Sequence, residues 1–182
     1  ITTLVGFYGC PLHCKFCIND QCHTSNPNSV MTSIDLYNYV KIDQLYFKAT
    51  GGGLTFGGGE PLIYAEFIEE VMNIGAKDWH TTIETSLNVP FAKWECLIDY
   101  IDEFIVDVKD MSPSIYKSYT GANNDVVVSN LKELQQQGLS DKILLRLPLI
   151  HSFNDNNDIQ RSRQELEMIG FSKFNEFSYK VL

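Results

Sequence analysis

The residues Gly9–Cys17, with the sequence GCPLHCKFC, are the stretch around which the rest of the chain is organised. Their three cysteines are spaced C-x3-C-x2-C and follow a strand-like run, Ile1–Tyr8, at a point where the chain must turn sharply. Soft thiolate ligands at this spacing select an iron–sulfur cluster or zinc over harder ions. Because three cysteines bind only three irons of a cubane 4Fe-4S cluster, the pattern predicts a fourth iron with an open coordination position.

Zinc remains an alternative for the same cysteines. Cys22, His13 or His23 would complete a four-coordinate site, since sites of four cysteines, or of three cysteines and a histidine, use similar spacings. Cys22 would equally serve as the fourth ligand of a fully cysteine-ligated cluster. Structural zinc sites usually draw on two separated ligand pairs, which favours the cluster with an open iron.

Composition excludes several classes of protein. The chain has 182 residues, 44% of them hydrophobic, and we expect one domain over residues 1–182 with a substantial core. The net charge of -9 and the lack of clustered Lys and Arg argue against a nucleic-acid partner. No window approaches the roughly 20 apolar residues of a membrane span, and the first residues read as a strand rather than a signal sequence. We therefore expect a cytoplasmic protein without a membrane partner.

Strand-like and helix-like segments alternate along the chain. Strands are expected at residues 1–8, 53–56, 81–85, 104–108, 143–147 and 174–181. Helices are expected at residues 34–47, 64–75, 91–100, 115–119, 125–138 and 157–169, with a loop at 18–33. Candidate helix caps are Thr32 or Ser33, and Asn124 or Asp125. This alternation predicts βαβ units and a parallel sheet, and six such units are too few for the closed eight-stranded barrel.

Residues that could bind a ligand or take part in catalysis gather where the expected strands end. The run Gly57–Glu60 closes the second strand, and its missing side chains let a bound molecule approach the backbone closely. Glu84 and Thr85 close the third strand, while Asp107 and Lys109 close the fourth. In barrels of parallel strands the active-site groups lie at the C-terminal ends, so these residues are candidates for one site.

Arg146 is the lone charge in the apolar fifth strand, and its guanidinium suits a carboxylate. Ordinary structural roles stay open here and at the other strand ends. A glycine-rich turn before a helix is common, and a carboxylate at a strand end can belong to a simple salt bridge. Arg146 can pair with Glu84 or Asp107, because buried charges are usually paired within the protein.

Two stretches resemble a known family. The cysteine spacing, with Phe16 immediately before the last cysteine, resembles the signature of the radical S-adenosylmethionine (SAM) enzymes. The run Thr50–Leu62, TGGGLTFGGGEPL, is similar to the glycine-rich segment of the activating enzymes of glycyl radical enzymes, typified by pyruvate formate-lyase activase. This resemblance implies an open (β/α)6 partial TIM barrel with parallel strands. The family pattern extends beyond both ends of the sequence, so we expect a fragment or a shortened form.

The resemblance also implies cofactors and the residues that hold them. Cys10, Cys14 and Cys17 are the implied ligands of a 4Fe-4S cluster and the catalytic residues. The residues implied to contact SAM are Phe16, Gly58, Gly59, Glu60, Glu84, Thr85, Asp107, Lys109 and Arg146. By resemblance the glycines bind the methionine amino group of SAM. The pairs Glu84–Thr85 and Asp107–Lys109 are implied to place the methionine part of SAM and a monovalent cation.

The predicted activity is reductive cleavage of SAM to a 5′-deoxyadenosyl radical. By resemblance, that radical takes a hydrogen atom from a glycine α-carbon of a partner, a glycyl radical enzyme, with a flavodoxin- or ferredoxin-type electron donor. Two other functions remain open on the residues alone: a radical SAM enzyme acting on another peptide or a small molecule, and a non-catalytic zinc-binding module.

Overall fold

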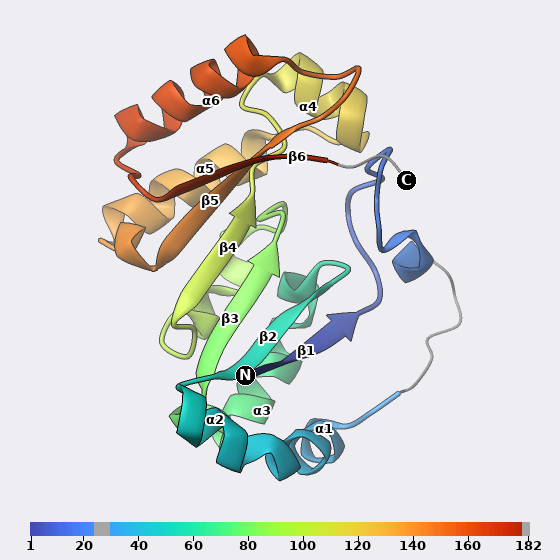
Figure 1. Cartoon of the computed structure of the whole chain (residues 1–182), viewed down its shortest axis with the longest axis vertical. Helices are drawn as coiled ribbons and strands as arrows, with labels where there is room; N and C mark the ends of the chain where they lie inside the picture. The colour runs from blue at the N-terminus through green and yellow to red at the C-terminus, as the bar shows by residue number, and fades with distance from the viewer. Residues whose placement is uncertain (24–29, 180–182) are drawn as a thin grey trace. The chain divides into compact units, whose positions relative to one another are not determined.

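Six runs rich in β-branched and aromatic residues form strands in the computed structural model, which describes residues 1–23 and 30–179. The strands are β1 (Thr2–Phe7), β2 (Gly53–Gly58), β3 (His80–Thr85), β4 (Glu103–Asp107), β5 (Ile143–Leu149) and β6 (Phe174–Ser178). They follow chain order in one six-stranded sheet, and the recorded pairings are parallel (Figure 1). The predicted α/β class with a parallel sheet is confirmed.

Helices separate the strands, as βαβ units require. The α-helices are α1 (Ser33–Val40), α2 (Gln44–Thr50), α3 (Ala65–Ile74), α4 (Pro113–Thr120), α5 (Asp125–Gln136) and α6 (Asn156–Ile169). Short 3-10 helices are η1 (Asp20–His23), η2 (Lys41–Asp43), η3 (Pro61–Tyr64), η4 (Ala76–Asp78), η5 (Phe91–Lys93), η6 (Glu95–Leu97) and η7 (Ser140–Lys142). No α-helix of the described residues is both long and apolar enough to span a membrane.

The chain divides into two compact units. The first unit contains residues 1–10, 19–84 and 91–103, and the second contains residues 11–18, 85–90 and 104–182. The cysteine-rich loop is therefore divided, with Cys10 in the first unit and both Cys14 and Cys17 in the second. The expectation of a single domain over residues 1–182 stays a prediction.

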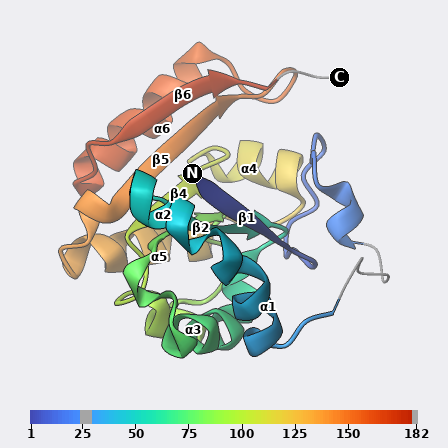
Figure 2. The same cartoon turned by 60° about the horizontal axis from the view of Figure 1, so that its bottom comes forward.

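The core of the first unit lies between its strands and α3. Helix α3 buries Ile68, Val71 and Met72 on one face, and α1 packs beside it (Figure 2). The strands contribute the fully buried side chains of Leu54, Phe56 and Ile83. Burial of each such side chain stabilises the fold by roughly 1.5–3 kcal/mol.

The core of the second unit lies between β4, β5 and the helices α5 and α6. Val106 and Leu145 are completely buried in the strands, and Leu131 and Leu134 of α5 are completely buried in the helix layer. Helices α5 and α6 contact one another, and α6 contacts β5. This packing fixes the ends of β4 and β5, where several candidate site residues lie.

Two predicted helices have a different form in the structure. Residues 91–100 form η5 and η6 rather than one α-helix, because Phe91, Trp94 and Leu97 recur every third residue, which matches the period of a 3-10 helix. The helix expected at 34–47 is broken by η2, where Thr3 of β1 donates a hydrogen bond to Asp43 at 3.1 Å. Thr32 is confirmed as a cap, and it forms a capping box with Asp35.

Segment ends show smaller differences. The loop expected at 18–33 contains η1, and its residues 24–29 lie outside the described residues. The sixth strand was expected to reach Val181, whereas β6 ends at Ser178 and residues 180–182 lie outside the described residues. Strand β5 is longer than expected and ends at Leu149, because its last residue pairs with Ser178.

Candidate functional site

The glycine-rich end of β2 is shaped by the backbone of β1 and of the residues that follow it. Gly58 has φ +86, a left-handed conformation that favours glycine. A Cβ at Gly59 would lie 2.3 Å from the carbonyl oxygen of Gly9 and 2.8 Å from that of Phe7. The N–H of Gly59 donates to Phe7 at 2.8 Å, and the N–H of Glu60 donates to Gly9 at 2.8 Å. The glycines therefore join the end of β2 to the segment that leads into the cysteine loop.

Glu60 has a local structural role within this turn. Its side chain is buried, with 1% exposed, and its Oε1 accepts a hydrogen bond from the N–H of Leu62 at 3.2 Å. Glu60 is thereby the N-cap of η3. Gly57 is less constrained, because a Cβ there would meet Cβ of Glu84 at 3.5 Å, an ordinary contact. Gly57 and Glu84 thus face one another on neighbouring strands of the first unit.

Thr85, the last residue of β3, belongs to the second unit. Its side chain is 5% exposed, and its Oγ1 accepts a hydrogen bond from the N–H of Leu87 at 2.8 Å. Leu87 has φ 59, so the threonine stabilises a strained turn. Asn130 of α5 supports the same turn by donating to the carbonyl oxygens of Leu87 and Val89, each at 2.8 Å.

Three charged side chains meet at the end of β4. Asp107 is the last residue of β4 and pairs in register with Arg146 of β5. The carboxylate of Asp107 lies 2.8 Å from Nζ of Lys109 and 2.7 Å from Nε of Arg146. The alternative that Arg146 pairs with Asp107 is thus confirmed. Arg146 lies within β5, which extends to Leu149, so the expectation of a lone charge in this apolar strand is confirmed.

The two carboxylate oxygens of Asp107 face different cations. Oδ1 of Asp107 is buried and has no hydrogen-bond partner among the described residues, although the Arg146 guanidinium is at ion-pair distance. Burial alone would lower the pKa of the Lys109 ammonium. The carboxylate of Asp107, with smaller contributions from Tyr179 and Cys14, outweighs the burial and raises that pKa above its ordinary value. Lys109 is therefore a fixed positive charge that shares the Asp107 carboxylate with Arg146.

Helix α4 anchors the part of the cysteine loop in the second unit. The N–H of His13 donates to Thr120 at 2.8 Å, and the N–H of Lys15 donates to Tyr119 at 3.1 Å. Phe16 packs against Tyr119 and against Phe153, with ring centroids 6.2 and 5.8 Å apart. These contacts hold the backbone on both sides of Cys14.

The thiols of the loop are suited to soft metal chemistry. All five cysteines are free of disulfides, and Cys10, Cys14 and Cys17 are partly exposed, whereas Cys22 is buried. Burial raises the pKa of the Cys14 thiol, and the Lys109 charge opposes that effect. Within the described residues no group of three His, Cys, Asp or Glu side chains is placed to hold a metal ion, and the three expected ligands are divided between the two units. As donors, the three free thiols fit an iron–sulfur cluster.

Two residues near these side chains were not expected from the sequence. Tyr179 lies 2.8 Å from Nζ of Lys109, through its hydroxyl. Asp110 is 3% exposed and accepts hydrogen bonds from the N–H of Ser112, at 2.8 Å, and from Asn154, at 3.2 Å. Burial raises the pKa of the Asp110 carboxyl. The position of Asp110 just after the fourth strand could have indicated it, whereas Tyr179 falls inside the expected sixth strand and carries no such signal.

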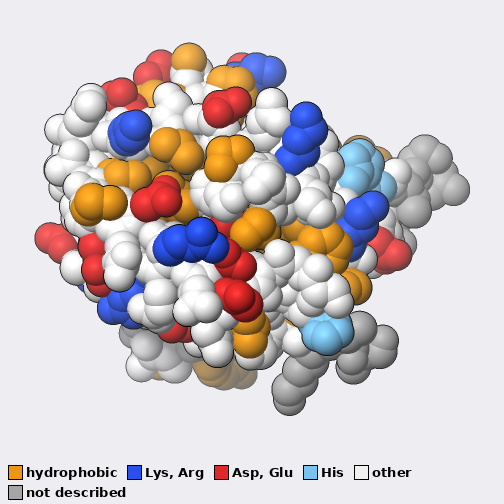
Figure 3. Space-filling model, turned by 90° about the horizontal axis from the view of Figure 1, so that it is seen from above, with side chains coloured by type: hydrophobic (Ala, Val, Ile, Leu, Met, Phe, Trp, Pro, Cys, Tyr) orange, Lys and Arg blue, Asp and Glu red, His pale blue; other side chains and the backbone are white. Residues whose placement is uncertain are grey.

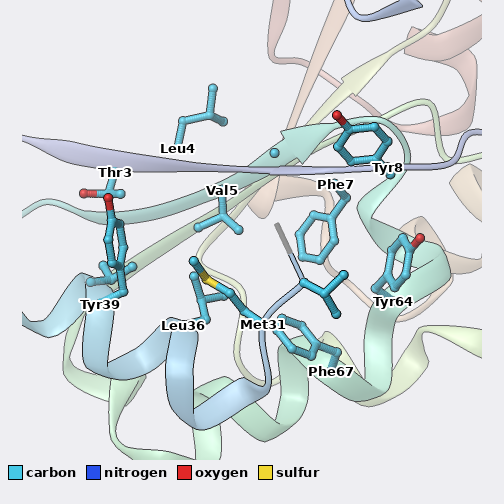
Figure 4. A pocket seen from close by; sticks show the side chains of 13 residues that line it. Thr3, Leu4, Val5, Phe7, Tyr8, Met31, Leu36, Tyr39, Tyr64 and Phe67 are labelled. Carbon is cyan, nitrogen blue, oxygen red and sulfur yellow. The ribbon is translucent and has the colours of Figure 1, made fainter. Parts of the chain in front are cut away.

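The first unit has an apolar cavity that none of the expected site residues lines. It has a volume of about 450 Å³ and lies along β1 (Figure 4). Val5 and Phe7 point into it toward Leu36, Met31 and Phe67. It is therefore a feature of the helix side of β1, separate from the residues at the strand ends.

The comparisons with known protein families identify the sequence motifs. The family model described as Radical SAM superfamily matches residues 4–163. The (2S)-3-sulfopropanediol dehydratase activating enzyme of Klebsiella oxytoca is 31% identical over 156 residues, which cover 79% of this chain and 49% of that protein. The pyruvate formate-lyase-activating enzyme of Clostridium pasteurianum is 27% identical over 159 residues, which cover 87% of this chain and 66% of that protein. The chain thus spans about half to two thirds of these relatives, and the resemblance to activating enzymes is confirmed.

Solved structures show the same fold. Streptococcus suis SuiB bound to S-adenosylmethionine superimposes with a TM-score of 0.74 at 17% identity, covering 100% of this chain and 41% of SuiB. Coproporphyrinogen III oxidase from Escherichia coli, described as a radical SAM enzyme, gives a TM-score of 0.61 at 12% identity, covering 100% of this chain and 44% of that chain. The predicted open (β/α)6 partial barrel is confirmed.

Proposed function

The chain belongs to the radical SAM superfamily, and from this premise we propose that it cleaves SAM reductively at a 4Fe-4S cluster and generates a glycyl radical on a partner enzyme. Membership of the family implies both cofactors. The observation that carries the proposal is the C-x3-C-x2-C loop, with free thiols, within a chain whose named relatives are activating enzymes. When bound, the cofactors supply the electron and the 5′-deoxyadenosyl group, while the protein supplies position and shelter from water.

Cys10, Cys14 and Cys17 are the proposed cluster ligands. None of the three is in a disulfide, and the backbone hydrogen bonds from His13 and Lys15 to α4 fix the loop on both sides of Cys14. Phe16 packs on two aromatic rings, and this contact anchors the loop to the second unit. A loop anchored in this way is ordered before metal binds, which lowers the entropic cost of bringing the ligands together.

Charges in the second unit match the polar end of SAM. A SAM carboxylate is suited to Lys109 and Arg146, since charge-assisted hydrogen bonds from ammonium and guanidinium groups are the stronger ones. Asp107 holds both cations in place, with Oδ2 at 2.8 Å from Lys109 and Oδ1 at 2.7 Å from Arg146. Thr85 contributes by holding the turn after β3.

The family resemblance also assigns residues of the first unit to SAM binding. By resemblance, the main chain at Gly58 and Gly59 is the proposed place for the methionine amino group, although the missing side chains there also admit the backbone of β1 and Gly9. Glu84 is the proposed acidic neighbour, as it contacts the Gly57 position. Glu60 supports this turn through its bond to Leu62, so we assign it an indirect role.

The proposed partner is a glycyl radical enzyme, because the named relatives are activating enzymes of that kind. A flavodoxin- or ferredoxin-type protein is the proposed electron donor, and the cytoplasm is the proposed location. We propose no nucleic-acid partner, because the net charge is -9 and the face in Figure 3 has Lys and Arg side chains scattered among acidic ones. No membrane partner is proposed either.

The experiment that tests this function measures metal, product and radical in turn. Protein reconstituted without oxygen should contain iron and sulfide and should form 5′-deoxyadenosine from SAM with dithionite. Mixing it with a candidate glycyl radical enzyme should produce the electron-spin signal of a glycyl radical. Cys14→Ala should lose nearly all iron, while the control Cys96→Ala, a partly exposed thiol in the first unit, should retain it. Colourless wild-type protein with one zinc would contradict the proposal.

A further inference from the structure

The phenol of Tyr179 contacts a group that the proposed SAM site uses. Tyr179 directly follows β6, and its N–H donates to the carbonyl oxygen of Leu149 at 3.1 Å. This bond extends the pairing of β6 with β5 by one residue and fixes where the tyrosine leaves the sheet. The Lys109 ammonium donates a hydrogen bond to the Tyr179 hydroxyl at 2.8 Å. Residues 70 positions apart in the sequence are thereby joined.

Aromatic contacts fix the orientation of the Tyr179 ring. It stacks on Tyr119 with centroids 6.3 Å apart and an interplanar angle of 28°. Phe177 meets it edge-on, with centroids 5.4 Å apart. A ring held by these contacts presents its hydroxyl in one place.

Lys109 needs such a fixed partner because it is almost buried. Its side chain is 9% exposed, and its ammonium has three N–H donors on a flexible four-carbon stem. Asp107 accepts one hydrogen bond at 2.8 Å and Tyr179 accepts another at 2.8 Å. With one partner at the end of β4 and the other directly after β6, the direction of the remaining N–H is set.

We propose that Tyr179 is a positioning residue, which holds Lys109 against Asp107 so that the ammonium presents its third N–H to the carboxylate of SAM. The inference rests on the proposed function, since it assumes that SAM binds at the end of β4. It goes further by extending the site to β6, through a side chain that does not itself need to touch the ligand.

The test is SAM affinity in the reconstituted protein, measured by equilibrium dialysis with labelled SAM. Tyr179→Phe keeps the ring and removes the hydroxyl, and we expect the dissociation constant to rise about tenfold, as for the loss of one hydrogen bond to a charged group. The matched control is Tyr100→Phe in the first unit, which loses a hydrogen bond of 2.9 Å to Asn73. This control should bind SAM as the wild type does.

A double-mutant cycle with Lys109→Met separates positioning from a general structural role. If Tyr179 acts through Lys109, Tyr179→Phe should have no further effect on SAM affinity once Lys109 is absent. In turnover, Tyr179→Phe should raise KM for SAM and leave kcat nearly unchanged, whereas partial misfolding would lower the apparent kcat and leave KM unchanged.

Three outcomes would overturn the inference. One is Tyr179→Phe protein that binds SAM as tightly as wild type does. Another is a Tyr179→Phe effect that is equally large in the Lys109→Met background, which would show that the phenol acts on its own. Wild-type protein that binds no SAM at all contradicts the proposed function, and the inference falls with it.

Discussion

The C-terminal end of β2 in the first unit is built from backbone, whereas the end of β4 in the second unit is built from charged side chains. At Gly59 the carbonyl oxygen of Gly9 leaves no room for a Cβ. At Asp107 the space is filled by the side chains of Lys109 and Arg146, at 2.8 and 2.7 Å. Substitution at the first place should therefore damage the fold, while substitution at the second should mainly change charge and ligand binding.

The largest effect on stability is expected at Gly59. In Gly59→Ala the new Cβ meets rigid backbone at 2.3 Å, so the turn must shift, and the free energy of unfolding should fall by about 3 kcal/mol. Urea unfolding of the metal-free protein measures this. The control is Gly57→Ala, whose Cβ would meet Glu84 and Leu4 at 3.5 and 3.6 Å, and which should change stability by less than about 0.5 kcal/mol. Equal effects at the two glycines would contradict the claim that the backbone of Gly9 excludes a side chain at Gly59.

A smaller loss of stability, with a clear effect on SAM binding, is expected at Asp107. Asp107→Asn leaves the nearly buried Lys109 without its carboxylate, so the free energy of unfolding should fall by about 2 kcal/mol. This loss is smaller than for a fully buried ion pair, because the Asp107 side chain is 23% exposed. Its SAM affinity should also fall. The control is Glu167→Gln, which breaks the exposed ion pair with Arg163 on α6 and should have no measurable effect. Unchanged SAM affinity in Asp107→Asn would contradict the claim that the charged side chains at the end of β4 bind SAM.

The free energy of unfolding at alkaline pH should report the ion pair between Lys109 and Asp107. The pKa of Lys109 is raised in the folded protein, so its contribution to stability is complete below its ordinary pKa, about 10.4, and is lost as pH rises above that value. The stability difference between wild type and Lys109→Met should therefore be constant near neutral pH and change only at alkaline pH, where the Cys14 thiol that Lys109 influences and then Lys109 itself titrate. A change near neutral pH would assign the titration to another group.

Asp110 gives the smallest of these effects, with the opposite direction in pH. Burial raises the pKa of this carboxyl, so the ionised form weakens the fold, and stability should increase as pH falls through the raised pKa. Relative to Asp110→Asn, wild type should gain stability on acidification by about 1.4 kcal/mol for each unit of pKa shift. Thermal unfolding of both proteins between pH 7 and 4 measures the difference, and parallel curves would contradict it.

Local patterns were sufficient to predict the strands, the parallel sheet and most helices. The prediction failed at residues 91–100, because apolar residues spaced by three fit an amphipathic α-helix as well as the 3-10 helices η5 and η6 that form there. It also failed at η2, where the bond from Thr3 to Asp43 joins segments 40 residues apart. Contacts of this kind leave no trace in a window of local sequence.

The candidate site was predictable only where a motif exists. The cysteine spacing and the strand-end residues Asp107 and Lys109 follow rules of chemistry and topology, so sequence was enough to select them. Tyr179 was missed because an aromatic residue after a strand has no distinctive pattern. The reason for Gly59 was also incomplete, since the close approach of Gly9 depends on the tertiary fold.

The most direct test of the central claim is a Mössbauer spectrum of protein reconstituted with ⁵⁷Fe, recorded with and without SAM. If Cys10, Cys14 and Cys17 hold a 4Fe-4S cluster with one open iron, the addition of SAM should change the signal of one iron and leave the other three nearly unchanged. A spectrum that SAM does not alter, or protein that binds zinc in place of iron, would contradict the account.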